Sequence, residues 1–352
     1  MSEFQFQLVA SLVKIAVTIG ALMGGVSVMT WVERRLSGVI QYRWGPNRVG
    51  PLGLFQPLAD GLKFIMKQDL IPAEAHKPFF ILAPALSLIP ALCAFAVIPF
   101  GPTVELLGRK VALVIVDIDG GLLFAFAATS LGVYGIVLAG WSSRNKYSLL
   151  GGLRSTAQMI SYELPLVLAF TAVLLVSGTL RPSAIVEQQA GWFWNWNVLA
   201  GGWQLLGFLI FVIAGFAETN RLPFDLPEAE AELVAGYHTE YSSMKFAMFF
   251  MAEYINMITS SALAVTLFLG GWQLGFPVPF EGWPLWILQI LAFLAKVAFF
   301  QFVFVWVRWT LPRFRYDQLM HIGWKRLLPL ALANVAITAV LVAFDVVGRQ
   351  VK

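Results

Sequence analysis

Residues 156–177 read TAQMISYELPLVLAFTAVLLVS, an apolar run that contains one carboxylate, Glu163, and one proline, Pro165. An α-helix needs about 20 predominantly apolar residues to cross the roughly 30 Å hydrocarbon core of a bilayer. The run is long enough to do so. It therefore predicts a transmembrane helix that carries an ionisable side chain inside the membrane.

Seven further apolar runs of similar length flank this segment. The chain is 59% hydrophobic and 12% charged, with a mean hydropathy of +0.75, whereas soluble domains carry about 25% charged residues. The sequence predicts an all-α polytopic membrane protein, with a single membrane domain over residues 1–352 and about eight transmembrane helices. The eight runs are 8–32, 79–99, 112–140, 156–177, 198–217, 245–269, 284–307 and 328–347.

The distribution of Lys and Arg predicts the orientation in the membrane. Seventeen of these residues lie in the loops and helix ends after the first, third, fifth and seventh helices, and three lie after the second, fourth and sixth. Basic residues accumulate on the cytoplasmic side of membrane proteins. Both termini are therefore expected outside, and the basic loops in the cytoplasm, or in the matrix of a mitochondrion. The pI of about 9.2 reflects this bias.

Few residues could hold a metal, a cluster or a nucleotide. Cys93 is the single cysteine, which excludes an internal disulfide framework or a thiolate-held iron–sulfur cluster. His76, His238 and His321 lack metal-ligand spacing, and no glycine-rich phosphate loop follows a strand pattern. The sequence predicts a chain that binds no metal or nucleotide of its own.

An amphipathic helix is expected at about residues 53–68, after the first transmembrane run. Its apolar and polar side chains fall on opposite sides of a helical wheel. This pattern is typical of a helix lying in the membrane interface, where it could hold open a lateral entrance for a lipid-soluble molecule. The alternative is a surface helix packed on the bundle. The apolar residues are Leu54, Phe55, Leu58, Leu62, Ile65 and Met66; the polar ones are Gln56, Asp60, Lys63 and Lys67.

Charged residues within or at the ends of the apolar runs are Lys14, Glu163, Glu218, Glu253 and Lys296. Each costs roughly 2.5–3.5 kcal/mol near a helix centre, unless it faces a hydrated interior and pairs. Counting residues from the inside ends places Glu163, Glu253 and Lys296 in a similar layer, with Glu218 at the inside surface. We interpret the three glutamates as a proton relay. Structural pairing is the alternative, and it is favoured for Lys14 in the outer half.

Two inside loops have unusual sequences. The first reads ERRLSGVIQYRWGPNRVGP at 33–51, where Pro, Asn and Gly predict a folded loop and the arginines could clamp carboxylates or phosphates. The second lies within an acidic loop at about 218–244 and reads ETNRLPFDLPEAEAELVAGYHTEY at 218–241, with six acids among apolar residues. We expect these carboxylates to line a cavity or to dock a basic partner.

Both loops resemble the signature motifs of the quinone-chamber subunit of respiratory complex I. This family comprises the bacterial H subunit of NADH:quinone oxidoreductase and its mitochondrial counterpart, the first ND subunit. The resemblance extends through the amphipathic segment, through Ser161-Tyr162-Glu163-Leu164-Pro165 and through Ala252-Glu253-Tyr254, and so covers nearly the whole chain.

The resemblance implies a subunit that is inactive alone, has no redox centre, forms a quinone-access chamber and couples quinone reduction to proton translocation. It implies quinone as substrate, with NADH, FMN and iron–sulfur clusters in partner subunits. The implied partners are the soluble subunits at the quinone site and the terminal cluster and the small membrane subunits of the membrane arm; no nucleic acid is expected. It further implies a multi-pass location in the bacterial inner membrane, with a mitochondrial inner membrane as the alternative. The implied chamber residues are Glu33, Arg34, Arg43, Arg48, Asp60 and Phe224. The implied proton-coupling residues are Glu163, Glu218, Glu253, Lys296, Asp225, Glu228, Glu230, Glu232 and Glu240.

Three other functions remain open. A related membrane subunit of membrane-bound hydrogenases or formate hydrogenlyase would have a NiFe partner and need no quinone tunnel. A stand-alone ion antiporter could use Glu163, Glu253 and Lys296, although paired broken helices and repeat symmetry are missing from the sequence. A passive membrane anchor would explain the apolar runs but not acids buried at one level.

Overall fold

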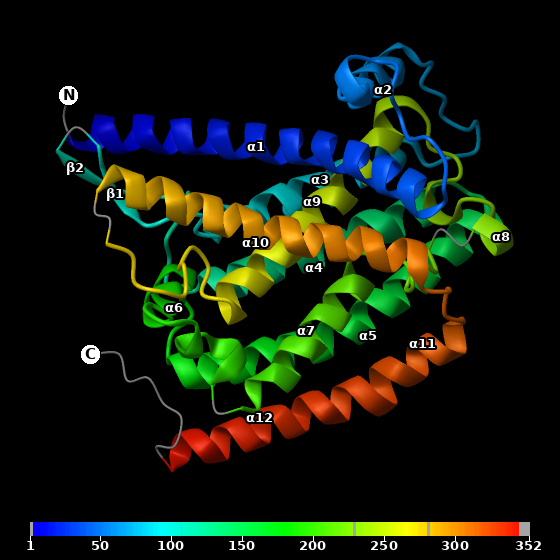
Figure 1. Cartoon of the computed structure of the whole chain (residues 1–352). Helices are drawn as coiled ribbons and strands as arrows, with labels where there is room; N and C mark the ends of the chain where they lie inside the picture. Colours follow the sequence, from blue (N-terminus) through cyan, green and yellow to red (C-terminus); the bar gives the residue numbers. More distant parts are fainter. Residues whose placement is uncertain (1–2, 107, 201, 228–229, 280–281, 345–352) are drawn as a thin grey trace.

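The helices of this chain run side by side across a bundle, in a computed structural model that describes residues 3–106, 108–200, 202–227, 230–279 and 282–344. α1 begins and α12 ends at one end of the bundle, which we call the terminal end (Figure 1). α2 and α8 lie at the opposite end, which we call the loop end. The predicted residue Glu228 and the last residues of the run 328–347 lie outside the described residues.

Within the described residues, seven helical stretches are long and apolar enough to cross a membrane, and α7, with 15 residues, is a shorter eighth. The prediction of an all-α polytopic membrane protein is confirmed. The helices are α1 (Glu3–Ile40), α3 (Lys77–Ala94), α4 (Gly121–Ser142), α5 (Lys146–Ser177), α7 (Gln204–Glu218), α9 (Ser243–Phe268), α10 (Trp283–Thr310), and α11 (Tyr316–Ile322) continuing through the π-helical turn Gly323–Leu327 into α12 (Leu328–Ala343).

Short elements connect these helices. Two antiparallel strands pair at the terminal end, although the sequence predicted only helices. Gly108 provides the positive φ of 75° that their tight turn requires. The short elements are η1 (Pro51–Gly53), α2 (Gln56–Met66), η2 (Phe95–Val97), β1 (Thr103–Leu106), β2 (Arg109–Ala112), α6 (Pro182–Gln188), η3 (Phe193–Asn195), η4 (Asn197–Leu199), α8 (Glu230–Leu233) and η5 (Gly236–His238).

Several helix boundaries differ from those expected from hydropathy. α1 continues past residue 32 to Ile40, because Glu33 and Arg34 form ion pairs and Arg35 donates to backbone carbonyls. α4 begins at Gly121 rather than 112, since β2 and a turn occupy the intervening residues. α7 begins at Gln204 rather than 198. Asn197 is instead held in a 3-10 turn, where its backbone N–H donates to Gln189 and its side-chain amide to the carbonyl of Leu267.

Small residues let the central helices approach closely. A Cβ on Gly140 would lie 2.6 Å from the carbonyl oxygen of Ser148, and one on Gly151 would lie 2.7 Å from the Cα of Gly236. Such contacts are typical of helix association in membranes, where burial of apolar surface provides little driving force. α5 consequently lies at the centre, against α4, α7 and α12. α1 and α12 lie at the margins, and few of their side chains are buried.

The predicted amphipathic helix is α2, at the loop end of the bundle (Figure 1). Its apolar face is exposed, with Leu58 at 65% and Ile65 at 66%, while Asp60 on the other face bonds Arg34 of α1. An exposed apolar face is expected for a helix resting in the membrane interface.

Candidate functional site

A cavity of about 660 Å³ lies between α1, α2, α9 and α10, near the loop end of the bundle. Most of the surface that lines it is apolar, and several polar and charged side chains also reach it. Ligand sites typically combine these features at volumes of about 300–1,000 Å³. The apolar lining includes Met23, Val26, Phe64, Ile65, Met244, Phe246, Ala247, Phe250 and Met251; the polar lining includes Ser27, Thr30, Glu33, Arg34, Ser37, Arg43, Asp60, Tyr254 and Arg308.

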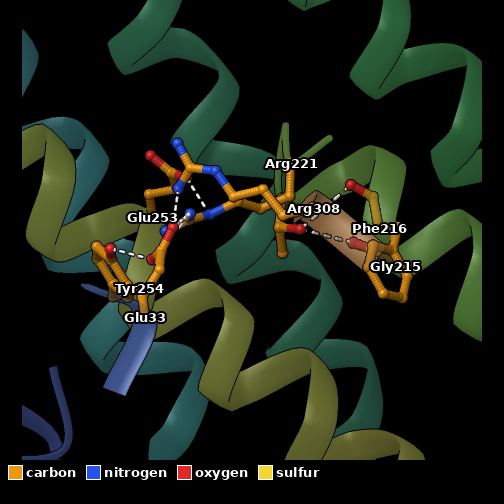
Figure 2. Close-up of polar contacts among 8 residues, drawn as sticks. Glu33, Gly215, Phe216, Arg221, Glu253, Tyr254 and Arg308 are labelled. Atoms are coloured by element: carbon orange, nitrogen blue, oxygen red, sulfur yellow. Dashed lines mark hydrogen bonds and ion pairs between the residues drawn. The ribbon is translucent and has the colours of Figure 1, made fainter. Parts of the chain in front are cut away.

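Glu33 accepts hydrogen bonds from three side chains that come from three different segments. Arg221 donates at 3.1 Å and 3.3 Å to its two carboxylate oxygens, Tyr254 donates from its hydroxyl at 2.5 Å, and Arg308 donates through Nη1. Figure 2 shows these groups converging on the one carboxylate. The Glu33 side chain is only 7% exposed, so its charge depends on these partners.

Arg221 links Glu33 to a second carboxylate. Its Nε forms an ion pair with Glu253, and its guanidinium lies over the ring of Tyr254 at 4.5 Å (Figure 2). Burial opposes the charge of Arg221, but Glu253 and Glu33 together raise its pKa well above the ordinary value. The arginine is therefore a permanent cation shared by two acids, of which Glu33 lines the cavity.

Asp60 of α2 forms a second polar group at the cavity. Arg34 donates to it at 2.5 Å, Gln56 donates at 3.3 Å, and Lys63 lies 3.5 Å away. Burial alone would raise the pKa of Asp60, but the hydrogen bond and charge of Arg34 outweigh it, so the pKa lies below its usual value. The resulting ion pair fastens α2 to α1 beside the cavity.

Glu218 and Glu163 lie deeper in the bundle, beside α4. Thr129 is hydrogen-bonded to Glu218, and Glu163 interacts electrostatically with the same carboxylate. Ser130, the next residue of α4, donates to Glu163. A small cavity of about 30 Å³ is lined by Glu218, Glu253 and Asn256, among others. It is large enough for a water molecule, which needs roughly 10–15 Å³.

Three described acids of the 218–241 loop, Asp225, Glu232 and Glu240, do not gather in one cavity. Arg313 donates to Asp225 at 2.8 Å, Arg154 donates to Glu232 at 2.7 Å, and Asn145 donates to Glu240 at 2.6 Å. Each thus holds the loop to a different part of the bundle. Glu230 begins α8.

His238, in the same loop, packs against two phenylalanines that line the large cavity. Its ring lies 5.1 Å from that of Phe246 and 6.0 Å from that of Phe250, and both phenylalanines line the cavity. Burial lowers the pKa of His238 to about 4, so the imidazole is neutral at pH 7.

Some sequence-predicted site residues lie elsewhere. Phe224 is buried against Tyr162 and Phe314, with ring centroids 5.4 Å and 5.6 Å away, and it is absent from the described lining of the large cavity. Its ring therefore packs on α5, which carries Tyr162, and not on α1. Arg48 is exposed and also absent from that lining.

Lys296 does not join the carboxylates, although the count of residues placed it at their level. Its ammonium donates to the carbonyls of Leu269, Gly271 and Gln273 at 2.7, 3.0 and 2.7 Å, and lies 4.3 Å from the ring centre of Trp196. The long side chain reaches the segment that follows α9. Lys14 behaves similarly, since it donates to the carbonyl of Val114 at 2.7 Å.

Three site residues were not singled out from the sequence: Arg221, Tyr254 and Arg308. Tyr254 follows Glu253 directly, and Arg308 is a basic residue in the last turn of an apolar helix. A buried carboxylate such as Glu33 requires cationic or hydroxyl partners. That requirement was the signal that could have identified them.

The titration of Asp225 provides a prediction for pH. Burial raises the pKa of this carboxyl to about 6; Arg313 and Arg308 lower it, and Glu253 raises it. The carboxyl is therefore protonated below pH 6 and ionised above it, so its ion pair with Arg313 strengthens as pH rises. An infrared titration should show a carboxylic C=O band that disappears with a midpoint near pH 6. The band should be missing from D225N, and its persistence there would refute the assignment.

Within the described residues, no group of three or more His, Cys, Asp or Glu side chains is arranged to hold a metal ion.

Known proteins similar to this chain give a consistent result. A family model described as NADH dehydrogenase matches residues 13–339. The chain is 53% identical to the second NADH-quinone oxidoreductase H subunit of Koribacter versatilis, over 97% of this chain and 99% of the relative. It is 49% identical to the first NADH-quinone oxidoreductase H subunit of Solibacter usitatus (95% and 97%) and 52% identical to NADH-quinone oxidoreductase subunit 8 of Rhodothermus marinus (92% and 95%). The chain therefore belongs to the NADH dehydrogenase family.

Proposed function

We propose that this chain is the membrane subunit of a proton-translocating NADH:quinone oxidoreductase that admits quinone from the bilayer and couples its reduction to proton movement. The observation that carries the proposal is the cavity between α1, α2, α9 and α10, which has apolar walls and a Glu33–Arg221–Glu253 group at its side. The names of the relatives, all NADH-quinone oxidoreductase subunits, favour this function over a hydrogenase subunit or an antiporter.

The cavity suits a quinone with an isoprenoid tail. The tail would lie against Met23, Phe64 and Met251, and the head-group oxygens would meet donors such as Arg34 and Arg308. α2 would support the entrance, because its apolar face rests in the membrane interface. Electrons would come from an iron–sulfur cluster in a partner subunit, after NADH oxidation at FMN in another. The chain itself would be inactive alone.

Quinone reduction would change the charge beside the Glu33–Arg221–Glu253 group. A quinone that takes up two electrons needs two protons to become quinol, and a transient negative charge in a poorly hydrated site acts strongly on its neighbours. Arg308 and Arg221 share Glu33, so attraction of either arginine toward the reduced head group would weaken its hold on the carboxylates. The electrostatic environment of Glu253 would then change, because Arg221 is its ion-pair partner.

The signal would then travel through the acids deeper in the bundle. Glu253 and Glu218 line the same 30 Å³ cavity, where one water molecule could bridge them. From Glu218, the hydroxyls of Thr129 and Ser130 lead to Glu163. The loop would be held in a fixed position relative to this path by the contacts of Asp225, Glu232 and Glu240. Lys296 is left out because its ammonium donates to backbone carbonyls and lies against Trp196, away from the carboxylates.

The remaining features fit a multi-pass subunit of the bacterial inner membrane. The loop end, with its basic residues, would face the cytoplasm and dock the soluble subunits. Small membrane subunits would contact the exposed faces of the helices.

Gly61 of α2 allows a direct test of the cavity. It lines the cavity, and a Cβ built there meets nothing within 4 Å. G61F would place a ring in the space, so the KM for a short-chain quinone should rise about tenfold or more, whereas NADH:ferricyanide reduction should stay unchanged. G61A is the matched control, because it adds one methyl group and favours the helix by about 0.5–1 kcal/mol. Normal quinone kinetics in G61F would count against the proposed binding site.

A further inference from the structure

Another cavity, of about 420 Å³, opens at the loop end of the bundle between the start of α3, the end of α4 and the start of α5. Its lining is His76, Trp141, Arg144, Asn145, Lys146 and Leu149. The rings of His76 and Trp141 are stacked, with centroids 4.8 Å apart and an angle of 7° between their planes. The cavity shares no lining residue with the proposed quinone cavity.

The charge of this cavity is positive. Arg144 and Lys146 are exposed, and neither forms an ion pair with any residue that the structure describes. α5, which has 32 residues, begins at Lys146, so its N-terminal partial charge adds to that of the side chains. Two acids lie nearby. Glu240 accepts from Asn145, and Glu74 is exposed two residues before His76, but neither lines the cavity.

Apolar side chains continue from the cavity along the bundle. Trp141 is 47% exposed and Leu149 is 40% exposed at the cavity itself. Farther along α5, Leu150 and Leu153 are 48% and 55% exposed, and Phe79 on α3 is 41% exposed. Exposed apolar residues on transmembrane helices face acyl chains or other membrane proteins. A cationic cavity therefore joins a surface suited to hydrocarbon at the level where Trp gathers in membrane proteins.

We propose that this cavity binds the phosphate head group of an anionic phospholipid, with the acyl chains lying along α3 and α5. Arg144 and Lys146 supply the charge, His76 can donate a hydrogen bond, and Trp141 and Leu149 contact the glycerol and upper acyl carbons. Basic pockets at the cytoplasmic ends of transmembrane helices suit such head groups, since that leaflet is negatively charged. The combination of cations with an apolar flank favours a lipid over a free anion, which would need no hydrocarbon surface.

The test uses the whole oxidoreductase complex, purified from cells that carry R144A/K146A in this chain. Neither substitution alters the Asn145–Glu240 contact, so the loop should keep its structure. After detergent washing, native mass spectrometry counts the phosphatidylglycerol molecules retained per complex. The variant should retain one fewer, and its affinity for added phosphatidylglycerol should fall about 30-fold, as expected for the loss of two cations near an anionic head group. K325A/R326A, which removes two exposed cations at the same end, is the matched control.

Three results would overturn the proposal. The first is equal lipid retention in R144A/K146A and the unmodified complex, or an equal loss in K325A/R326A, since either would mean that no specific site exists. The second is loss of a protein subunit with unchanged lipid, which would assign the cavity to a protein partner. The third is full displacement of the lipid by soluble glycerol phosphate, which would indicate a site for free anions.

Discussion

The variant R221M should lose coupled quinone reduction almost completely. The substitution removes the cation that Glu33 and Glu253 share, and it leaves the buried Glu33 to Arg308 and Tyr254. Removing one partner of a buried ion pair destabilises a protein by about 3–5 kcal/mol. We therefore expect reduced amounts of assembled complex on native gels. Among the complexes that do assemble, quinone reduction should fall to background while NADH:ferricyanide reduction persists.

The variant R221K tests whether the positive charge at position 221 is sufficient or whether the geometry of the guanidinium is also needed. Lysine keeps the cation but cannot reach two carboxylates with a planar fork, so partial assembly and strongly reduced quinone activity are expected. R315A is the control, because Arg315 is 79% exposed and its ion-pair partner among the described residues is the exposed Asp317. If R221M assembles and reduces quinone normally, Arg221 does not organise the site.

The variant E218Q should separate quinone reduction from proton translocation. Glutamine keeps a carbonyl oxygen for the hydrogen bond with Thr129 but cannot take up a proton. If Glu218 carries the signal from Glu253 toward Glu163, proton uptake and release driven by NADH should fall roughly 100-fold, the usual effect of removing a group that transfers protons. The measurement is acidification by complexes reconstituted in vesicles, divided by the rate of NADH oxidation.

The matched control is E105Q, in the β-hairpin at the terminal end, where the side chain is exposed. S130A should have a smaller effect than E218Q, since a water molecule could replace the hydroxyl that donates to Glu163. An unchanged ratio of protons to NADH in E218Q would exclude Glu218 from the path.

Hydropathy and charge predicted much of this architecture because the bilayer imposes simple rules. Length and composition identify a transmembrane helix, and the wheel of residues 54–67 identified α2. The β-hairpin escaped prediction because four-residue strands outside the membrane carry no comparable signal. The start of α7 was not predicted, because the preceding turn is fixed by a hydrogen bond from the backbone of Asn197 to the side chain of Gln189, which hydropathy does not reveal.

Four of the six residues that the resemblance assigns to a quinone chamber lie together in the lining of the large cavity: Glu33, Arg34, Arg43 and Asp60. Their role in binding quinone stays a prediction. Depth along a helix gives the level of a side chain but not its direction, and this is why Lys296 was grouped with the glutamates. The partners of Glu33 lie 188, 221 and 275 residues away in sequence, so only the fold could bring them together.

The most direct test of the proposed function is a structure of the assembled complex in lipid with a bound quinone. We expect a quinone tail between α1, α2 and α9, with the tail or head group against residues of the 660 Å³ cavity such as Phe64 and Met251. A quinone that enters and binds without contact to α1, α2, α9 or α10 would contradict the proposed function.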